Sequence, residues 1–241
     1  MAAAQNGRVS DPAPRLAALA RLLADETRAA FCLALLDGRA WTAGELAAHA
    51  GVAASTATEH LHRLVEGGLL VQRHQGRHRY VQLADARAAQ LLEELTGALA
   101  PAPAPAGPLR VVTASAALAR ARTCYDHLAG ALGVAITDAM TGAGLLDQSA
   151  GFALTPAGRA WLTGPLGVDA ATLEPGRRPL VRPCLDWTQR RTHLAGLAGA
   201  QLCTRAFALG WVRRIGSGRA VRLTPAGATA LAEQLDLRLD A

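Results

Sequence analysis

One stretch of this sequence, from Trp41 to Leu83, constrains the fold more than any other part of the chain. Its first half contains two short segments with apolar residues at helical spacing, which predicts two helices joined by a tight turn. Thr42 can cap the first helix, over residues 43–50, because its hydroxyl can accept a hydrogen bond from an unpaired N–H group of the first turn. Gly51 ends this helix, and a glycine pair at 67–68 ends the second.

The second half of the stretch predicts a β-hairpin. Residues 69–73 and 78–83 alternate apolar and polar side chains, as half-buried strands do, and residues 75–77 join them. Two helices followed by such a hairpin are typical of a winged helix-turn-helix, in which the second helix enters the DNA major groove. The alternative is a small helical module with an exposed hairpin that binds nothing.

The two faces of the second helix favour DNA binding. One face carries Ala57, His60, Leu61, Leu64 and Val65. The other face carries short hydrogen-bonding side chains in place of the long charged ones of a purely solvated helix. The candidate DNA-binding residues of this helix and the hairpin are Ala54, Ser55, Thr56, Thr58, Glu59, His62, Arg63, Arg73, Gln75, Arg77, His78 and Arg79. We therefore expect double-stranded DNA as a partner.

A run of alternating alanine and proline at residues 100–108 predicts a semi-rigid linker. We expect a disordered segment at 1–13, a winged helix-turn-helix domain at 14–99 and a second domain at 109–241. The fold class is mainly α with small β-hairpins (α+β). Within the first domain, the leucines of a helix at 84–99 exceed what the hairpin can cover, so we favour a dimer face shared with the first helix over packing within the domain.

Residues 14–99 resemble the ArsR/SmtB family of winged-helix transcriptional regulators. The residues that carry the resemblance are Leu-Ala-Asp-Glu-Thr-Arg at 23–28, Glu-Leu-Ala at 45–47, Gly-Val at 51–52, Ser-Thr-Ala-Thr-Glu-His-Leu-His-Arg-Leu at 55–64, Gly-Leu-Leu-Val at 68–71 and Gly-Arg-His-Arg-Tyr at 76–80. The resemblance implies a homodimer that binds a partly palindromic operator, usually represses, and is released by a signal. The family's metal sensors carry paired cysteines on the first helix of the motif, and residues 44–50 contain none. The resemblance therefore does not imply a metal sensor.

The C-terminal half contains an internal repeat, over residues of about 115–165 and 184–237. His-Leu-Ala-Gly at 127–130 recurs at 193–196, and Leu-Thr-Pro-Ala-Gly at 154–158 recurs at 223–227. Each copy predicts a helix, a β-hairpin and a second helix that begins with a Thr cap and a Pro in its first turn. Such duplicated modules pack against each other, and they are either winged-helix-like or of another fold.

The segments before the repeated helices concentrate reactive and charged side chains. The candidate effector or sensor residues are Arg122, Cys124, Asp126, His127, Cys184, Asp186, Trp187, Arg190, Arg191 and His193. Three interpretations stay open: a thiol or metal sensor, an anion-binding effector pocket, and ordinary ion pairs with structural histidines. The two His-Leu-Ala-Gly copies begin 66 residues apart, so His127 and His193 are equivalent. At the same offset Cys124 aligns with Arg190 and Cys184 aligns with Leu118, so we expect the two thiols not to be equivalent. This favours the structural interpretation, and we assign no metal ligands and no cofactor, although a metal ion or small-molecule effector stays open.

The remaining features narrow the class of protein. Residues 109–241 hold 15 Arg against 9 acids, which accounts for the whole net charge of +6, so these modules provide a second candidate DNA-binding surface. We find no nucleophile elbow, P-loop or paired-histidine zinc motif and expect no enzyme.

The first 14 residues lack an apolar core, no apolar run could span a bilayer, and the four cysteines are widely spaced. We expect a cytoplasmic regulator with reduced thiols, with Cys32 and Cys203 in the core.

Overall fold

The structure is a computed structural model that describes residues 11–76, 78–99, 109–149, 151–174, 176, 178–216 and 218–239. Its contacts divide the chain into two units, one of residues 1–35 and 39–84 and one of residues 36–38 and 85–241. We call them the N-terminal unit and the C-terminal unit. Within the described ranges, no helix combines the length and the apolar character needed to cross a membrane.

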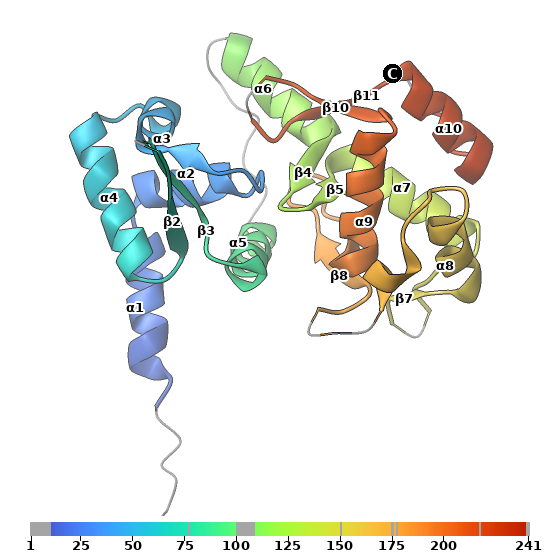
Figure 1. Ribbon diagram of the computed structural model, residues 1–241, viewed down its shortest axis with the longest axis horizontal. Helices are drawn as coiled ribbons and strands as arrows, with labels where there is room; N and C mark the ends of the chain where they lie inside the picture. Colours follow the sequence, from blue (N-terminus) through green and yellow to red (C-terminus); the bar gives the residue numbers. More distant parts are fainter. Residues whose placement is uncertain are drawn as a thin grey trace, which may run out of the picture. The chain divides into compact units, whose positions relative to one another are not determined.

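The N-terminal unit is a winged helix-turn-helix, as the sequence predicts (Figure 1). Its elements are α1 (Ala13–Leu23), α2 (Glu26–Leu35), β1 (Trp41–Thr42), α3 (Ala43–Ala50), α4 (Ala54–Glu66), β2 (Leu70–Gln75) and β3 (His78–Leu83). The three strands form an antiparallel sheet in the order β1-β3-β2. The wing is the hairpin of β2 and β3, in which Leu70 pairs with Leu83 and Gln75 with His78.

Local chemistry explains where the helices of the motif begin and end. Thr42 and Glu45 form a reciprocal capping box, in which Thr42 Oγ1 accepts from the Glu45 N–H at 3.3 Å and Glu45 Oε2 accepts from the Thr42 N–H at 2.7 Å. Gly51 ends α3 in the left-handed conformation, at φ +68°. Leu46, Leu61 and Leu64 then meet in a buried core. The predicted cap, turn and apolar face are all confirmed.

Helix α5 (Ala86–Ala98) groups with the C-terminal unit by its contacts, although the sequence analysis placed residues 84–99 in the winged-helix domain. Asp85 caps it by accepting from the N–H groups of Arg87 and Ala88, each at 2.9 Å. Its buried face includes Leu92 and, unusually, the carboxylate-bearing Glu93. The linker predicted at 100–108 and the N-terminal segment through residue 10 lie outside the described residues.

The C-terminal unit has the same order of elements in each half: hairpin, helix, hairpin, helix (Figure 1). After α6 (Leu109–Arg120), the first half comprises β4 (Arg122–Cys124), β5 (His127–Ala129), α7 (Gly130–Gly142), β6 (Leu146–Asp147), β7 (Ala153–Leu154), α8 (Pro156–Thr163) and the 3-10 helix η1 (Ala170–Leu173). The second comprises β8 (Arg182–Leu185), β9 (Thr192–Ala195), α9 (Gly196–Ala208), β10 (Val212–Arg214), β11 (Val221–Leu223) and α10 (Pro225–Leu235). The sequence predicted the helix, hairpin and helix of each half but not the hairpin that precedes them.

The repeated sequence motifs occupy matching places in the two halves. Thr155 and Thr224 cap α8 and α10 by accepting from the N–H groups of Gly158 and Gly227, at 3.0 and 3.1 Å. The predicted caps are therefore confirmed. A leucine carbonyl from the preceding strand lies close to a glycine of α9, Gly199, and only a residue without a side chain fits there.

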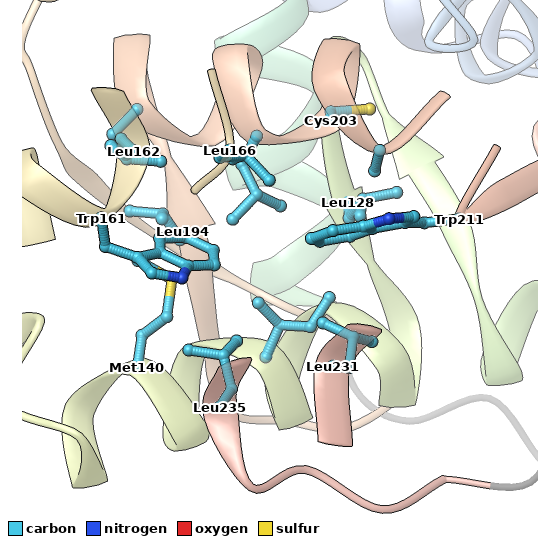
Figure 2. Packing of buried hydrophobic residues seen from close by; sticks show 14 of the residues in the cluster. Leu128, Met140, Trp161, Leu162, Leu166, Leu194, Cys203, Trp211, Leu231 and Leu235 are labelled. Atoms are coloured by element: carbon cyan, nitrogen blue, oxygen red, sulfur yellow. The ribbon is translucent and has the colours of Figure 1, made fainter. Parts of the chain in front are cut away.

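One hydrophobic core joins the two halves of the C-terminal unit (Figure 2). Trp161 and Trp211 lie at opposite ends of the displayed cluster, with leucines from both halves between them and Met140 against Trp161. Each fully buried Leu of this kind contributes about 1.5–3 kcal/mol to folding. Cys203 lies in this core and Cys32 in that of the N-terminal unit, both as predicted.

The glycine of α9 provides a test of this packing. A Cβ added to Gly199 would lie 2.4 Å from the carbonyl oxygen of Leu194, whereas one added to Gly142, at the end of α7, would meet nothing within 4 Å. We expect Gly199→Ala to lower the free energy of unfolding by about 1–3 kcal/mol through overpacking. Gly142→Ala should leave it unchanged or raise it by about 0.5–1 kcal/mol. Urea unfolding of both variants checks this, and equal stabilities would contradict it.

Candidate DNA interface and cysteine–histidine cluster

The exposed face of α4 carries every candidate residue that the sequence placed on this helix. Ala57, Leu61 and Leu64 hold the opposite face in the core. The exposed candidates are Ala54, Ser55, Thr56, Thr58, Glu59, His62 and Arg63. The helix begins after Ala53, whose methyl group cannot cap it, so the first-turn N–H groups and the positive end of the helix dipole face outward.

An exposed ion pair and an exposed histidine–carboxylate contact lie along this face of α4. Glu59 accepts from Arg63, and Glu66 lies 3.2 Å from His62. Pairs this exposed contribute at most about 1 kcal/mol, so they can open when a partner arrives. The side chains of Glu59, His62 and Arg63 can therefore turn toward a bound partner.

The wing presents further polar side chains. Arg73, Gln75, His78 and Arg79 are all exposed, and Arg79 donates to Gln72 Oε1 at 3.3 Å. Arg77, at the predicted tip, lies outside the described residues. The wing therefore offers cationic and hydrogen-bonding groups of the kind that bind phosphate.

A second cluster lies within the C-terminal unit, where two hairpins bring four residues together. Cys124 pairs across the strands with His127 in β4–β5, and Cys184 pairs in the same way with His193 in β8–β9. All four are buried, and their ligand atoms lie within 4.8 Å of one another. The two imidazoles stack with ring centroids 5.0 Å apart, and their Nε2 atoms are 3.1 Å apart.

The cross-strand pairing corrects the prediction that the two thiols are not equivalent. That prediction used one offset of 66 residues, which is the separation of His127 and His193. Cys124 and Cys184 are only 60 positions apart, because the β8–β9 hairpin has a longer loop than the β4–β5 hairpin. Each cysteine is the cross-strand partner of its histidine, so the thiols occupy matching positions after all.

Charged groups surround the cluster and set its protonation. Hydrogen bonding with Cys124 lowers the pKa of Cys184, while the same contact and burial raise the pKa of Cys124. Burial opposes the protonation of His127, but Asp126, Cys184 and Glu93 outweigh it and raise its pKa to about 9. Burial raises the pKa of Glu93 to about 7. Cys184 is thus the thiol of the cluster with the lower pKa.

Glu93 is a member of this environment that the sequence analysis missed. Its Oε2 accepts from Cys184 Sγ at 3.6 Å and from Arg182 at 3.2 Å. Glu93 lies on α5, which packs against β8. The sequence did not mark Glu93 as a site residue, because a single acidic residue on a helix of leucines is usually exposed to solvent.

Other candidate residues form structural contacts. Arg122 and Asp186 are fully buried and bond at 2.8 Å, and the Arg122 guanidinium lies 4.7 Å from the centre of the Trp187 ring. Arg190 donates to the carbonyls of Gly97 and Leu99 at the end of α5, each at 2.8 Å. These are the contacts of the ion-pair interpretation, and they do not form an open anion pocket.

Two further candidates lie in ion pairs of their own. The Asp126 carboxylate accepts two hydrogen bonds from Arg178, one of them at 2.9 Å from Nη2. Against the effect of burial, the hydrogen bonds with His127 and Arg178 hold the pKa of Asp126 low, at about 2. Arg191 bonds Asp138 on the surface at 2.9 Å. Arg191 therefore does not belong to the cluster, whereas Asp126 borders it through His127.

Comparisons with known proteins agree on the class of the chain. Residues 23–73 match the family described as a helix-turn-helix domain. The uncharacterized HTH-type transcriptional regulator YdfF of Bacillus subtilis strain 168 is 37% identical over 227 residues, which cover 94% of this chain and 99% of that protein. The HTH-type transcriptional regulator CmtR of Mycobacterium tuberculosis is 45% identical over 80 residues, 33% of this chain and 67% of its own length. The NMR structure of the cadmium metal-sensor CMTR from Mycobacterium tuberculosis is 38% identical, covers 38% of this chain and 99% of that one, and has a TM-score of 0.31.

The buried Arg122–Asp186 pair yields a prediction about stability. Asp186→Asn keeps the shape of the side chain but leaves the Arg122 guanidinium buried beside a neutral amide, which should cost about 3–5 kcal/mol. Asp138→Asn removes the charge from the exposed pair with Arg191 and should cost no more than about 1 kcal/mol. Denaturant unfolding measures both values. A small, equal loss in the two variants would show that the buried pair does not stabilise the C-terminal unit.

Proposed function

The chain belongs to the winged helix-turn-helix transcriptional regulators of the ArsR type, and we propose that it binds a partly palindromic operator as a homodimer and represses transcription. In this proposal α4 enters the major groove, where Ser55, Thr58, Glu59 and His62 sample base edges. Arginines of α4 and the wing hold phosphates on either side.

The observation that carries the proposal is the exposed face of α4. Its first turns expose the short hydroxyl side chains of Ser55, Thr56 and Thr58, its N-terminal turn faces outward without a side-chain cap, and the wing adds exposed arginines. Short polar groups on a rigid helix can reach base edges with little loss of side-chain entropy. A helix that only faced solvent would gain nothing from this composition.

Exposed leucines support the dimer. Leu16 on α1 is 67% exposed, and Leu95 and Leu99, on α5 and just after it, are 47% and 65% exposed. Large apolar side chains in such positions gain free energy when a second copy covers them. A dimer would present two α4 helices to half-sites about 34 Å apart, one helical turn of DNA.

The short connection between β3 and α5 supports regulation of DNA binding by the C-terminal unit. Only Ala84 and Asp85 separate the end of β3 from the start of α5, and α5 packs against β8. The wing strand of the N-terminal unit and α5 of the C-terminal unit are thus joined by two residues of the chain. We propose that an effector or a change in dimerisation uses this connection.

A second function has an observation of its own. Arg213 and Arg222 are exposed cross-strand partners on the β10–β11 hairpin, in the half of the chain that holds all of the excess positive charge. This hairpin could contact phosphates as a second wing. The chain would then be an extended DNA-binding protein without an effector.

The proposed interface makes different predictions for its two kinds of residue. Glu59→Ala or His62→Ala should change base preference by about 1–3 kcal/mol at single positions, because such groups contact bases. Arg79→Ala should weaken binding to all sequences alike and reduce the salt slope by about 1, because it contacts phosphate. Fluorescence anisotropy on a set of duplexes at several salt concentrations measures both effects.

The matched control for the salt slope is the double variant Arg213→Ala, Arg222→Ala in the full chain. An unchanged slope in this variant supports the proposal, and a slope reduced by about 2 supports the extended DNA-binding alternative. If the changes on α4 and the wing leave both affinity and preference intact, the proposed interface is wrong.

A further inference from the structure

We propose that Cys124, His127, Cys184 and His193 bind one divalent transition-metal ion of the zinc class within the C-terminal unit. The four side chains come from two hairpins that are far apart in the sequence, and each hairpin supplies one thiol and one imidazole. The site lies within the C-terminal unit alone and does not depend on the proposed DNA interface.

The donor set is that of a tetrahedral metal site, and the separation of its two nitrogens is close to the expected value. Two sulfurs and two imidazole nitrogens at tetrahedral positions are ligands that select zinc over magnesium or calcium. With Zn–N bonds of about 2.0–2.1 Å, two nitrogens lie roughly 3.3 Å apart, and Zn–S bonds of about 2.3 Å place two sulfurs roughly 3.8 Å apart. The observed separation of the two Nε2 atoms is 3.1 Å, and all four ligand atoms lie within 4.8 Å of one another.

The orientation of the two histidines also supports a metal site. Their Nε2 atoms face each other at 3.1 Å, and a carboxylate lies on the Nδ1 side of each ring. Asp126 Oδ1 lies 3.4 Å from Nδ1 of His127, and Asp186 Oδ2 lies 3.8 Å from Nδ1 of His193. The Asp126 contact is a hydrogen bond of the kind that fixes the tautomer of a metal-bound histidine and makes its Nε2 a better donor, whereas Nδ1 of His193 makes no hydrogen bond with a described residue.

The supporting carboxylates are themselves held in place. Arg178 bonds both oxygens of Asp126, while Arg122 and the N–H groups of Gly130 and Thr188 bond Asp186. A metal site needs such a fixed outer shell, because loosely held ligands bind weakly. The rigidity is thus already present around the four donors.

The charge balance also suits a buried ion. Each cysteine would release its proton to solvent on coordination, so two thiolates would neutralise one divalent cation. The ion and its four ligands would then be neutral together, which avoids most of the cost of burying the ion's charge. Bound metal would tie β4–β5 to β8–β9 and so join the two halves of the unit at a second point beside their shared core.

A disulfide is the main alternative for these thiols. None of the four cysteines, all of which lie in the described part of the chain, is disulfide-bonded. A disulfide between Cys124 and Cys184 would use the sulfurs but leave the convergence of the two Nε2 atoms without a partner. The geometry of all four side chains is therefore better explained by a metal.

The first test uses the unmodified full-length chain, freed of metal with a chelator under reducing conditions and titrated with Co²⁺. We expect one Co²⁺ per chain, with thiolate-to-cobalt charge transfer and the visible bands of a tetrahedral site, and displacement by Zn²⁺. X-ray absorption of the zinc form should give two sulfur ligands at about 2.3 Å and two nitrogen ligands at about 2.0–2.1 Å. Failure to bind one equivalent, or a ligand shell without sulfur, would overturn the proposal.

The second test compares cysteine variants that differ only in position. Cys184→Ser should weaken zinc binding by more than about 100-fold, since even outer-shell changes cost about 10–100-fold. The matched control is Cys203→Ser, because Cys203 and Cys184 are each 4% exposed in the same unit. Cys203→Ser should keep one ion per chain and the full rise in Tm on adding zinc, whereas Cys184→Ser should lose both.

Two outcomes of this comparison would contradict the site. One is retention of stoichiometric metal by a Cys124→Ser, Cys184→Ser double variant. The other is a native mass that shows a Cys124–Cys184 disulfide together with no zinc uptake after reduction. If Cys184→Ser does not fold, the cobalt spectrum and the absorption data on the unmodified chain decide the question by themselves.

Discussion

The C-terminal unit depends on one buried carboxylate, that of Asp186. It accepts from Arg122 at 2.8 Å, from the Gly130 N–H at 2.7 Å and from the Thr188 N–H at 2.8 Å, so it joins β4, the start of α7 and the loop after β8. These partners hold the pKa of the carboxyl well below its usual range, with Arg122 opposing the effect of burial. Because the same carboxylate lies beside His193, the interaction that fixes the two hairpins also fixes the geometry of the cysteine–histidine cluster.

The N-terminal unit follows a simpler logic, in which each step is local. The capping box of Thr42 and Glu45 sets the start of α3, Gly51 allows the turn, and the apolar face of α4 fixes which side chains remain exposed. The short polar side chains of α4 therefore face outward as a consequence of packing. Their chemistry then suits base edges, which connects the sequence pattern to the class of transcriptional regulators.

These differences explain how much the sequence could predict. The helix-turn-helix, the wing, the threonine caps of α8 and α10 and the buried Cys203 were predicted, because each depends on residues a few positions apart. The equivalence of Cys124 and Cys184 was not, because a loop of different length in one hairpin shifts the alignment between the halves. Glu93 was missed for a related reason: its contact with Cys184 joins residues 91 positions apart, and no local pattern marks such a contact. Arg122 and Asp186 were recognised as candidates, but only the fold shows that their charges satisfy each other.

The central claim is that the exposed face of α4 makes this chain a sequence-specific, dimeric DNA-binding regulator. Selection of the full-length chain on a library of randomised duplexes tests it most directly. We expect enrichment of a partly palindromic sequence whose half-sites are separated by about 10 base pairs, the spacing of two recognition helices on one side of the DNA. Enrichment of no sequence, or of a single site without symmetry, would contradict the account.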